Sequence, residues 1–266
     1  MPLTETIGEA TINGLAYVGD LARLAGGAAR AVVIDPFRGG KIRWARSVHQ
    51  AMAVGVEALP IVSLISFFVG MILALQGAYE LRTLGAMQLV ANMVAISITR
   101  ELGPLMTAIM VIGRSGSAFA AEIGTMKVNE EIDALETMAL EPVNFLVAPK
   151  FLAMILMMPC LTTWADFMGV LGGGLFGVTN AGFTWATYFH ATINALVLRD
   201  VMTGLVKSVM FGLVITAVGC QEGFSTGLGS EQVGRSTTSA VVKSIFLVIA
   251  VDLVFTALFY FTAPQQ

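Results

Sequence analysis

The sequence predicts an all-α integral membrane protein with five transmembrane helices, an N-terminal amphipathic helix at the interface and a helix in a cytoplasmic loop. Hydrophobic residues make up 56% of the 266 residues, and only 12% are charged, against about 25% in an ordinary soluble domain. The mean hydropathy is +0.80. This composition excludes a disordered chain and a soluble domain. The net charge of −3 argues against a nucleic-acid partner.

Residues 1–50 form a separate N-terminal region, because basic residues interrupt every apolar run there. Apolar side chains nevertheless recur at helical spacing in this region. They are Leu15, Val18, Leu21, Ala22 and Ala25. This pattern predicts an amphipathic helix that lies in the membrane interface rather than across the bilayer.

Residues 51–266 form the transmembrane domain, in which five segments are long and apolar enough to cross a bilayer. They cover about 54–79, 86–113, 151–177, 200–221 and 240–262. Segment 183–198 is apolar and aromatic but short. We expect it to be an interfacial or re-entrant helix, with a sixth span as the alternative. Residues 223–239 are rich in Gly, Ser and Thr, which is typical of a loop.

The basic residues are distributed unevenly between the two sides that five spans define. The N-terminal segment and the 113–150 and 221–243 loops share one side and hold eleven of the 15 Lys and Arg residues. The opposite side holds only Arg82 and Arg199. The positive-inside rule therefore places the N-terminus in the cytoplasm and the C-terminus outside.

Five ionisable residues lie inside the spans, where each costs roughly 2.5–3.5 kcal/mol on insertion scales. Arg100, Glu101, Lys207 and Asp252 include two acids and two bases, and we expect them to form one neutral polar cluster. Asp166 is expected to lie outside it. Such a cluster is either a polar site on a transport path or a set of ion pairs that lock helices together. The sequence leaves both interpretations open.

Residues 129–141 are predicted to form a surface helix in the cytoplasmic loop. Its acidic residues are Glu130, Glu131, Asp133 and Glu136, and its apolar face comprises Val128, Ile132, Leu135 and Ala139. Asn129 is placed to cap the helix and Pro142 to end it. The helix is either a solvated loop helix or a docking helix for a cytoplasmic partner.

Two further patterns concern helix surfaces. Gly169, Gly173 and Gly177 lie four residues apart, which allows another helix to approach closely; packing within the chain is favoured over a dimer seam. Leu73, Leu81 and Leu84 form an apolar stripe at the outer end of the first span. That stripe either lines a path for an apolar ligand or is ordinary core and lipid-facing surface.

No catalytic or metal site is predicted. Residues 113–116 match the Gly-x-Ser-Gly of intramembrane serine proteases, but Ser115 lies at the cytoplasmic end of a span and His190 near the opposite face. His49 and His190 have no Cys or carboxylate at metal-ligand spacing. The sequence also lacks the G-x-x-x-x-G-K-[ST] motif, so we expect no ATP to bind through a P-loop of this chain.

The segment from Arg100 to Ala153 carries an ordered series of motifs. They are Arg-Glu-Leu-Gly-Pro at 100–104, Gly-Arg-Ser-Gly-Ser-Ala at 113–118, Ala-Glu-Ile-Gly-Thr-Met at 121–126, Glu-Glu-Ile-Asp-Ala-Leu-Glu at 130–136, and Pro-Lys-Phe at 149–151. This series resembles the MlaE (YrbE) family of ABC-transporter permeases, which serve MCE proteins. Leu75-Gln76-Gly77, Lys207-Ser208, residues 233–238 and Asp252 extend the resemblance to about residues 45–261.

The resemblance implies a homodimer in the inner membrane, two copies of a cytoplasmic ATPase that binds ATP, a hexameric periplasmic MCE protein and a STAS-domain protein. The substrate class it implies is phospholipid, with a role in outer-membrane lipid asymmetry. On this interpretation residues 129–140 form the coupling helix, and Leu73, Leu81 and Leu84 line the lipid path. The alternative is a secondary transporter coupled to protons through Glu101, Asp166 and Asp252.

Overall fold

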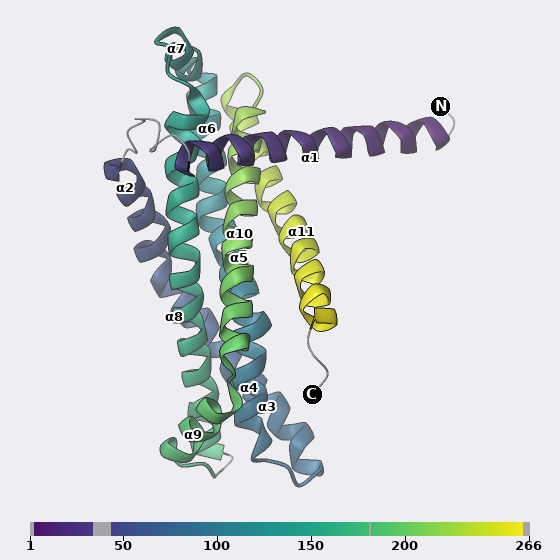
Figure 1. Cartoon of the computed structure of the whole chain (residues 1–266), viewed down its shortest axis with the longest axis vertical. Helices are drawn as coiled ribbons and strands as arrows, with labels where there is room; N and C mark the ends of the chain where they lie inside the picture. The colour runs from purple at the N-terminus through teal and green to yellow at the C-terminus, as the bar shows by residue number, and fades with distance from the viewer. Residues whose placement is uncertain (1–2, 34–43, 181, 263–266) are drawn as a thin grey trace.

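A computed structural model describes residues 3–33, 44–180 and 182–262, and within these ranges the chain is helical apart from short connections, with no strand. Five helical segments are long and apolar enough to cross a membrane: 46–83, 89–128, 143–180, 198–224 and 230–262. They run along the long axis of the molecule (Figure 1). The predicted all-α fold with five spans is confirmed. Each span is longer than predicted because the helices continue beyond the apolar core into polar sequence.

The first three spans are built from consecutive helical pieces. The first comprises α2 (Trp44–Gly55), a 3₁₀ turn (Val56–Ala58) and α3 (Leu59–Thr83). The second comprises α4 (Leu89–Ser97), a π-helical turn (Ile98–Leu102), α5 (Gly103–Val111), a second π-helical turn (Ile112–Gly116) and α6 (Ser117–Val128). The third comprises a π-helical turn (Val143–Val147) and α8 (Ala148–Asn180).

The last two spans are α10 (Leu198–Phe224) and α11 (Ser230–Thr262). The loop predicted over 223–239 is therefore wrong, because only residues 225–229 separate the two helices. Local interactions hold the polar sequence after Gly229 in a helix. Arg235 pairs with Glu231 one turn earlier at 2.8 Å, and the Thr238 hydroxyl donates to the carbonyl oxygen of Gly234 at 3.1 Å.

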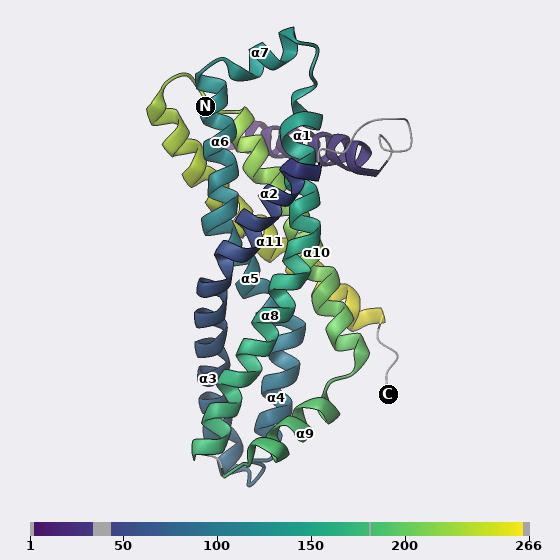
Figure 2. The same ribbon diagram turned by 90° about the vertical axis from the view of Figure 1, so that its left-hand side faces the viewer.

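Segment 183–198 does not form a sixth span. It contains α9 (Trp185–Ala195), which has 11 residues, and at 1.5 Å per residue this helix is too short to cross a bilayer. It lies at the end of the bundle opposite α7 (Figure 2). The Thr184 hydroxyl caps its first turn by accepting from the backbone N–H of Thr187 at 3.2 Å.

The N-terminal helix α1 (Leu3–Val33) lies across the bundle instead of along it (Figure 1). This placement agrees with an interfacial helix, but the face that packs on the bundle differs from the one predicted. Leu24 and Ala28 are buried, Leu21 and Ala25 are half-buried, and Val18 and Ala22 are exposed. The Leu15 side chain lies outside the described part of the structure.

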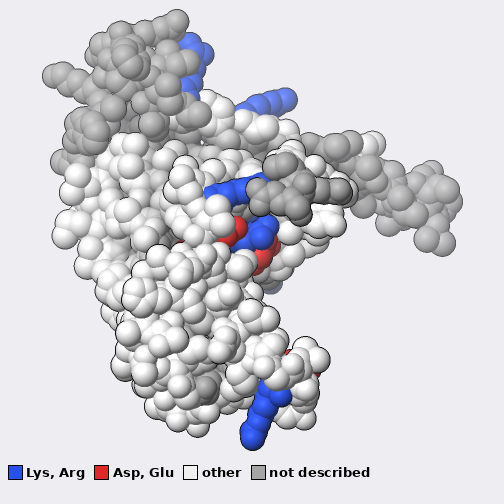
Figure 3. Space-filling view, turned by 60° about the horizontal axis from the view of Figure 1, so that its bottom comes forward, with Lys and Arg blue, Asp and Glu red and all other residues white. Residues whose placement is uncertain are grey.

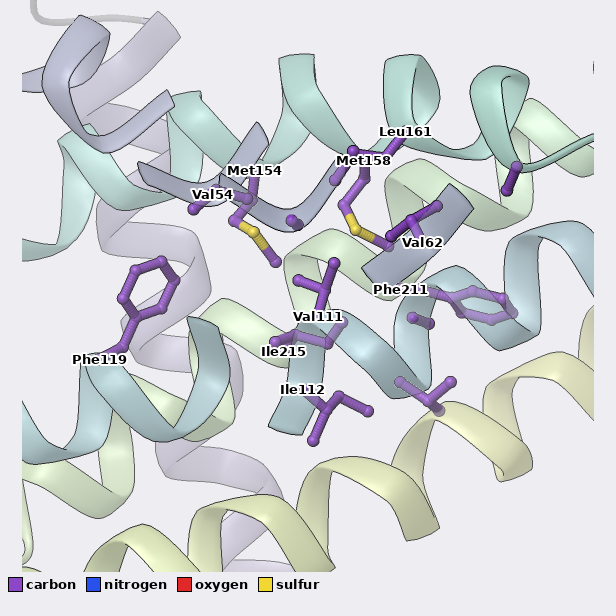
Figure 4. Close-up of a cluster of buried hydrophobic side chains, with 14 residues drawn as sticks. Val54, Val62, Val111, Ile112, Phe119, Met154, Met158, Leu161, Phe211 and Ile215 are labelled. Carbon is purple, nitrogen blue, oxygen red and sulfur yellow. The ribbon is translucent and has the colours of Figure 1, made fainter. Parts of the chain in front are cut away.

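The glycines of α8 are packed within the chain, as predicted. A Cβ atom built on Gly172 would lie 1.9 Å from the Phe67 carbonyl oxygen of α3, and one built on Gly70 would lie 1.9 Å from the Gly169 carbonyl oxygen. Any side chain larger than hydrogen would therefore separate α3 from α8 at this crossing. Next to it, Val62, Val111, Met158 and Phe211 belong to one cluster of buried side chains to which α3, α5, α8 and α10 contribute (Figure 4).

Candidate functional site

Lys207 of α10 is the centre of an ion cluster within the membrane-spanning bundle. Its side chain is 0% exposed and forms ion pairs with Glu101 of the π-helical turn and with Asp252 of α11, the latter at 2.9 Å from Nζ to Oδ1. Nζ also donates a hydrogen bond of 2.7 Å to the Thr256 hydroxyl. Two carboxylates and a hydroxyl thus compensate the cost of burying one ammonium group.

The π-helical turn at Ile98–Leu102 places Glu101 beside Lys207. Pro104 follows this turn and has no backbone N–H to donate, so regular α-helical hydrogen bonding is interrupted there. α10 approaches the turn closely at Gly204, where a built Cβ atom would lie 2.2 Å from the Thr99 carbonyl oxygen. Because Lys207 lies one turn after Gly204, this close contact brings its side chain within reach of Glu101.

Arg100 does not pair with Lys207's partners. Its Nε lies 3.6 Å from Asp200 Oδ1, and Asp200 also accepts the backbone N–H of Val197 at the start of α10 at 3.2 Å. Three of the four residues expected in one cluster therefore come together, while the fourth forms a separate pair. Sequence reasoning missed Asp200 and Thr256. Only Thr256 had a signal in the sequence, because it lies one helical turn after Asp252.

The cluster is open to the molecular surface on one side. The side chain of Glu101 is 37% exposed, although Lys207 itself is enclosed. Arg100, which belongs to the separate pair with Asp200, is 44% exposed. In the space-filling view, acidic and basic side chains meet in one central patch that uncharged side chains surround, and further basic side chains lie toward the edges of this face (Figure 3). The exposed part of the cluster is the Glu101 carboxylate, and one base with two acids carries a formal net negative charge, so this site can contact a cationic or zwitterionic group.

Asp166 of α8 lies apart from this cluster, as expected. Its Oδ1 atom is buried and has no hydrogen-bond partner among the described residues. That atom lies against Gly103, since a Cβ atom built there would be 1.8 Å away from it.

The leucine stripe of the first span is divided between two environments. Leu73 and Leu81 are half-buried and pack against the cluster of buried side chains between α3 and α4, which includes Ala78 and Val94. Leu84 is 76% exposed at the end of α3. Nearby, a hollow of about 590 Å³ lies between the start of α4 and α9 and has both amide and apolar lining, including Asn92, Phe183 and Asn194.

The predicted surface helix is shorter than expected. α7 comprises Glu131–Thr137, and its N-cap is Glu130, with φ +60° and no side-chain cap bond, in place of Asn129. The helix ends at Thr137, well before Pro142. The Leu140 N–H bonds to the Leu135 carbonyl oxygen at 3.0 Å, and Ala139 has φ +56°, which is the geometry of a left-handed C-terminal cap.

The four acidic residues predicted on this helix, Glu130, Glu131, Asp133 and Glu136, are all exposed. Ile132 and Leu135 are buried beneath them. Ile132 belongs to a cluster of buried side chains with Ile123, Val147 and Phe151. The apolar face therefore anchors α7 to α6 and α8, which leaves the acidic face free to contact another molecule.

A second charged network joins three helices at the α7 end of the bundle. Glu222 of α10 accepts hydrogen bonds from Lys243 at 2.8 Å and from Ser239 at 2.6 Å, both from α11. Lys243 Nζ also lies 4.5 Å from the centre of the Tyr17 ring of α1. Burial and the negative charge of Glu222 raise the pKa of Tyr17 above its usual value, so Tyr17 stays neutral.

The residues of the protease motif are far apart. Ser115 is buried in the second π-helical turn, between α5 and α6, whereas His190 lies in α9, which is at the end of the bundle farthest from α7 (Figure 1). No group of three or more His, Cys, Asp or Glu side chains that could hold a metal ion occurs in the described residues.

Comparison with known proteins identifies a family over most of the chain. The family model described as permease MlaE matches residues 47–258. A probable ABC transporter permease protein of Rickettsia felis is 37% identical over 97% of this chain and 98% of its own length. The intermembrane phospholipid transport system permease protein MlaE of Haemophilus influenzae is 35% identical over 80% of this chain and 82% of its own. The chloroplastic protein trigalactosyldiacylglycerol 1 of Arabidopsis thaliana is 35% identical over 83% of this chain and 63% of its own.

Proposed function

Because this chain belongs to the MlaE permease family, we propose that it is the membrane subunit of an ATP-driven transporter that moves phospholipids between the inner membrane and a periplasmic MCE protein. The family match carries this proposal, because its residues 47–258 include nearly all of the five transmembrane segments and every residue of the Lys207 cluster. The name of the Haemophilus influenzae relative supplies the substrate class. In a bacterium with an outer membrane, such transport serves to maintain outer-membrane lipid asymmetry.

A separate cytoplasmic ATPase hydrolyses the ATP, and a STAS-domain protein associates with that ATPase. The exposed acidic face of α7 supports this part of the proposal, because four carboxylates on a short anchored helix can fit a basic groove on a partner. α7 lies at the same end of the bundle as α1. The basic residues of the N-terminal region and of segment 113–150 support a cytoplasmic location for that end, with the N-terminus inside and the C-terminus in the periplasm.

The lipid path lies near Leu73, Leu81 and Leu84 at the outer end of α3, with two copies of the chain forming its walls. In the most apolar 18 residues of α11, only 11% of the residues are buried within one chain. The corresponding share in the first span is 28%. These surfaces therefore remain available to lipid or to a second copy. The path opens toward the hexameric MCE protein, and the Lys207 cluster offers polar contacts for a headgroup.

The test is purification of the full-length protein from its native membrane in mild detergent, followed by reconstitution in phospholipid vesicles. We expect an ATPase and an MCE protein to co-purify, and lipid exchange between the vesicles and the MCE protein to require ATP. Lipid transport by the isolated chain driven by a pH gradient, with no ATPase bound, would overturn the proposal in favour of a proton-coupled secondary transporter.

A further inference from the structure

Four polar side chains near the middle of the bundle lack hydrogen-bond partners among the described residues. They are Ser66 of α3, Thr107 of α5, and Thr162 and Asp166 of α8. Thr107 and Thr162 are fully buried and Ser66 nearly so. Most buried hydroxyls in membrane helices donate to the carbonyl oxygen one turn earlier, as Thr216 does to Gly212 at 2.8 Å. These three hydroxyls do not, although each unsatisfied polar group costs energy in such a place.

The helix crossings bring these four side chains to one level. Asp166 contacts Gly103 of α5, and Gly169 contacts Gly70 of α3. Thr107 follows Gly103 by one turn, and Thr162 precedes Asp166 by one turn on the antiparallel helix, so the helical register places these two threonines at the same level.

Ser66 reaches the same junction from the third helix. It precedes Gly70 by one turn, just as Asp166 precedes Gly169 by about one turn, and α3 and α8 run in the same direction. The register thus places the three hydroxyls at the level of a single carboxyl group, where α3, α5 and α8 share one cluster of buried side chains.

A backbone carbonyl also faces this carboxyl group. The Cβ atom built on Gly103 would lie 1.8 Å from Asp166 Oδ1 and 2.9 Å from the Ile98 carbonyl oxygen, so the two oxygens are at most 4.7 Å apart. The Ile98 oxygen already accepts the backbone N–H of Gly103 and has one lone pair left. Asp166 Oδ1 is an acceptor when the carboxyl group is ionised. A positive charge between them would turn an unfavourable contact into a favourable one.

We propose that Asp166, the hydroxyls of Ser66, Thr107 and Thr162, and the Ile98 carbonyl oxygen form a binding site for one small monovalent cation, Na⁺. Oxygen atoms of carboxylate, hydroxyl and carbonyl groups are the ligands that hard cations take. Interrupted membrane helices supply such carbonyls to Na⁺ in other transport proteins. One carboxylate balances one positive charge, which a membrane interior tolerates better than a net charge.

This site lies next to the π-helical turn that carries Arg100 and Glu101. An ion that binds Asp166 and the Ile98 carbonyl oxygen would tie the start of that turn to α8, because residue 98 begins the turn. Bound Na⁺ would therefore stabilise the conformation in which Glu101 contacts Lys207. The cation site does not depend on the proposed function, since its evidence is the packing of α3, α5 and α8 alone.

The experiment measures the thermal unfolding of the purified full-length protein in mild detergent, in NaCl, KCl and choline chloride at equal ionic strength. A ligand that binds only the folded state raises the unfolding temperature in a saturable way. We expect a rise of a few degrees in NaCl, with no comparable rise in KCl or choline chloride. Binding of radioactive ²²Na⁺ to the same preparation provides a direct measurement.

Variants decide where the ion binds. Asp166→Asn and Thr107→Val should abolish the Na⁺-dependent rise and most ²²Na⁺ binding, whereas the matched control Thr163→Val should retain both. The Thr163 hydroxyl is exposed and already bonds to the Pro159 carbonyl oxygen at 2.9 Å. Unfolding temperatures in KCl and size-exclusion profiles show whether each variant folds. Equal stability of the unmodified protein in all three salts, or an unchanged Na⁺ effect in a folded Asp166→Asn variant, would overturn the proposal.

Discussion

Lys207 is the residue whose environment has the clearest energetic consequence. It is enclosed, and its two carboxylate partners differ in exposure, since Glu101 is partly open to the surface. Removing the shared base leaves two acids facing each other in an apolar bundle. Removing one acid leaves Lys207 with the other. The three positions should therefore respond unequally to substitution.

We expect Lys207→Ala to destabilise the protein by about 3–5 kcal/mol, the typical cost of leaving a buried charge without its partner. Glu101→Gln and Asp252→Asn should each cost less. Thermal unfolding in detergent measures the difference, with Arg235→Ala as the control, because that exposed pair contributes at most about 0.5 kcal/mol. If Lys207→Ala is no less stable than Arg235→Ala, the cluster does not stabilise the fold.

Transport assays on the same variants separate the two interpretations that the sequence leaves open. In a structural cluster, loss of lipid transport follows loss of stability across all variants. A direct role in transport predicts at least one variant that folds and binds its partners but moves no lipid. Partial recovery in the double variant Lys207→Asp/Asp252→Lys would show that these two side chains act as a pair.

The glycines at the α3–α8 crossing allow a second prediction at this scale. Gly172→Ala places a methyl group 1.9 Å from a backbone oxygen that no side-chain rotation can move. We expect a loss of at least about 1–3 kcal/mol, as in other overpacked cores. Gly234→Ala in α11 meets nothing within 4 Å and should be neutral or stabilising by up to about 1 kcal/mol. Equal unfolding temperatures for the two variants would contradict the crossing geometry.

At the scale of elements, α7 shows how one short helix divides its two faces between folding and recognition. Ile132 and Leu135 hold it on the bundle, so its exposed acids do not contribute to folding. Their position on a surface loop rather than in the core is typical of residues that bind partners.

The triple variant Glu130→Lys/Glu131→Lys/Asp133→Lys should therefore release the proposed ATPase without unfolding the spans. Exposed substitutions usually change stability by less than about 0.5 kcal/mol each, whereas reversing three charges converts attraction to a basic groove into repulsion. Co-purification in mild detergent measures the loss. The control Glu141→Lys/Glu231→Lys changes exposed acids at the same end but outside α7. An ATPase that stays bound to the folded triple variant would show that α7 is not the docking helix.

At the scale of the whole molecule, the two ends of the bundle differ in charge and in the elements they carry. α1, α7 and the 225–229 connection lie at one end, and α9 and the α3–α4 connection lie at the other (Figure 1). The positive-inside rule predicts that the first end is cytoplasmic. An impermeant thiol reagent can test this directly.

In a background with Cys160→Ser and Cys220→Ala, Leu84→Cys should react with an impermeant maleimide added to intact spheroplasts. Thr137→Cys should react only after the membrane is permeabilised. Both positions are exposed in the structure, so failure to react reflects sidedness rather than burial. The reverse pattern would invert the topology, and labelling of both positions in intact spheroplasts would point to leaky membranes or mixed orientation.

The sequence by itself determined the features that depend on local composition and spacing. Apolar length predicts the five spans because a bilayer demands about twenty consecutive apolar residues, and the basic residues predict their direction. The ordered motifs between residues 100 and 153 indicate the family. The four-residue spacing of Gly169, Gly173 and Gly177 correctly predicts a close helix contact within the chain.

Only the tertiary structure decided the features that depend on which helices are neighbours. Arg100 and Glu101 are adjacent in sequence, yet the π-helical turn directs one toward Asp200 and the other toward Lys207. Periodicity assigned α7 a longer extent, because it does not reveal the left-handed backbone at Glu130 and Ala139. The junction around Asp166 draws its oxygen atoms from three spans. The crossings of those spans are set by backbone contacts at glycines, and these are contacts between distant segments that no local pattern in the sequence records.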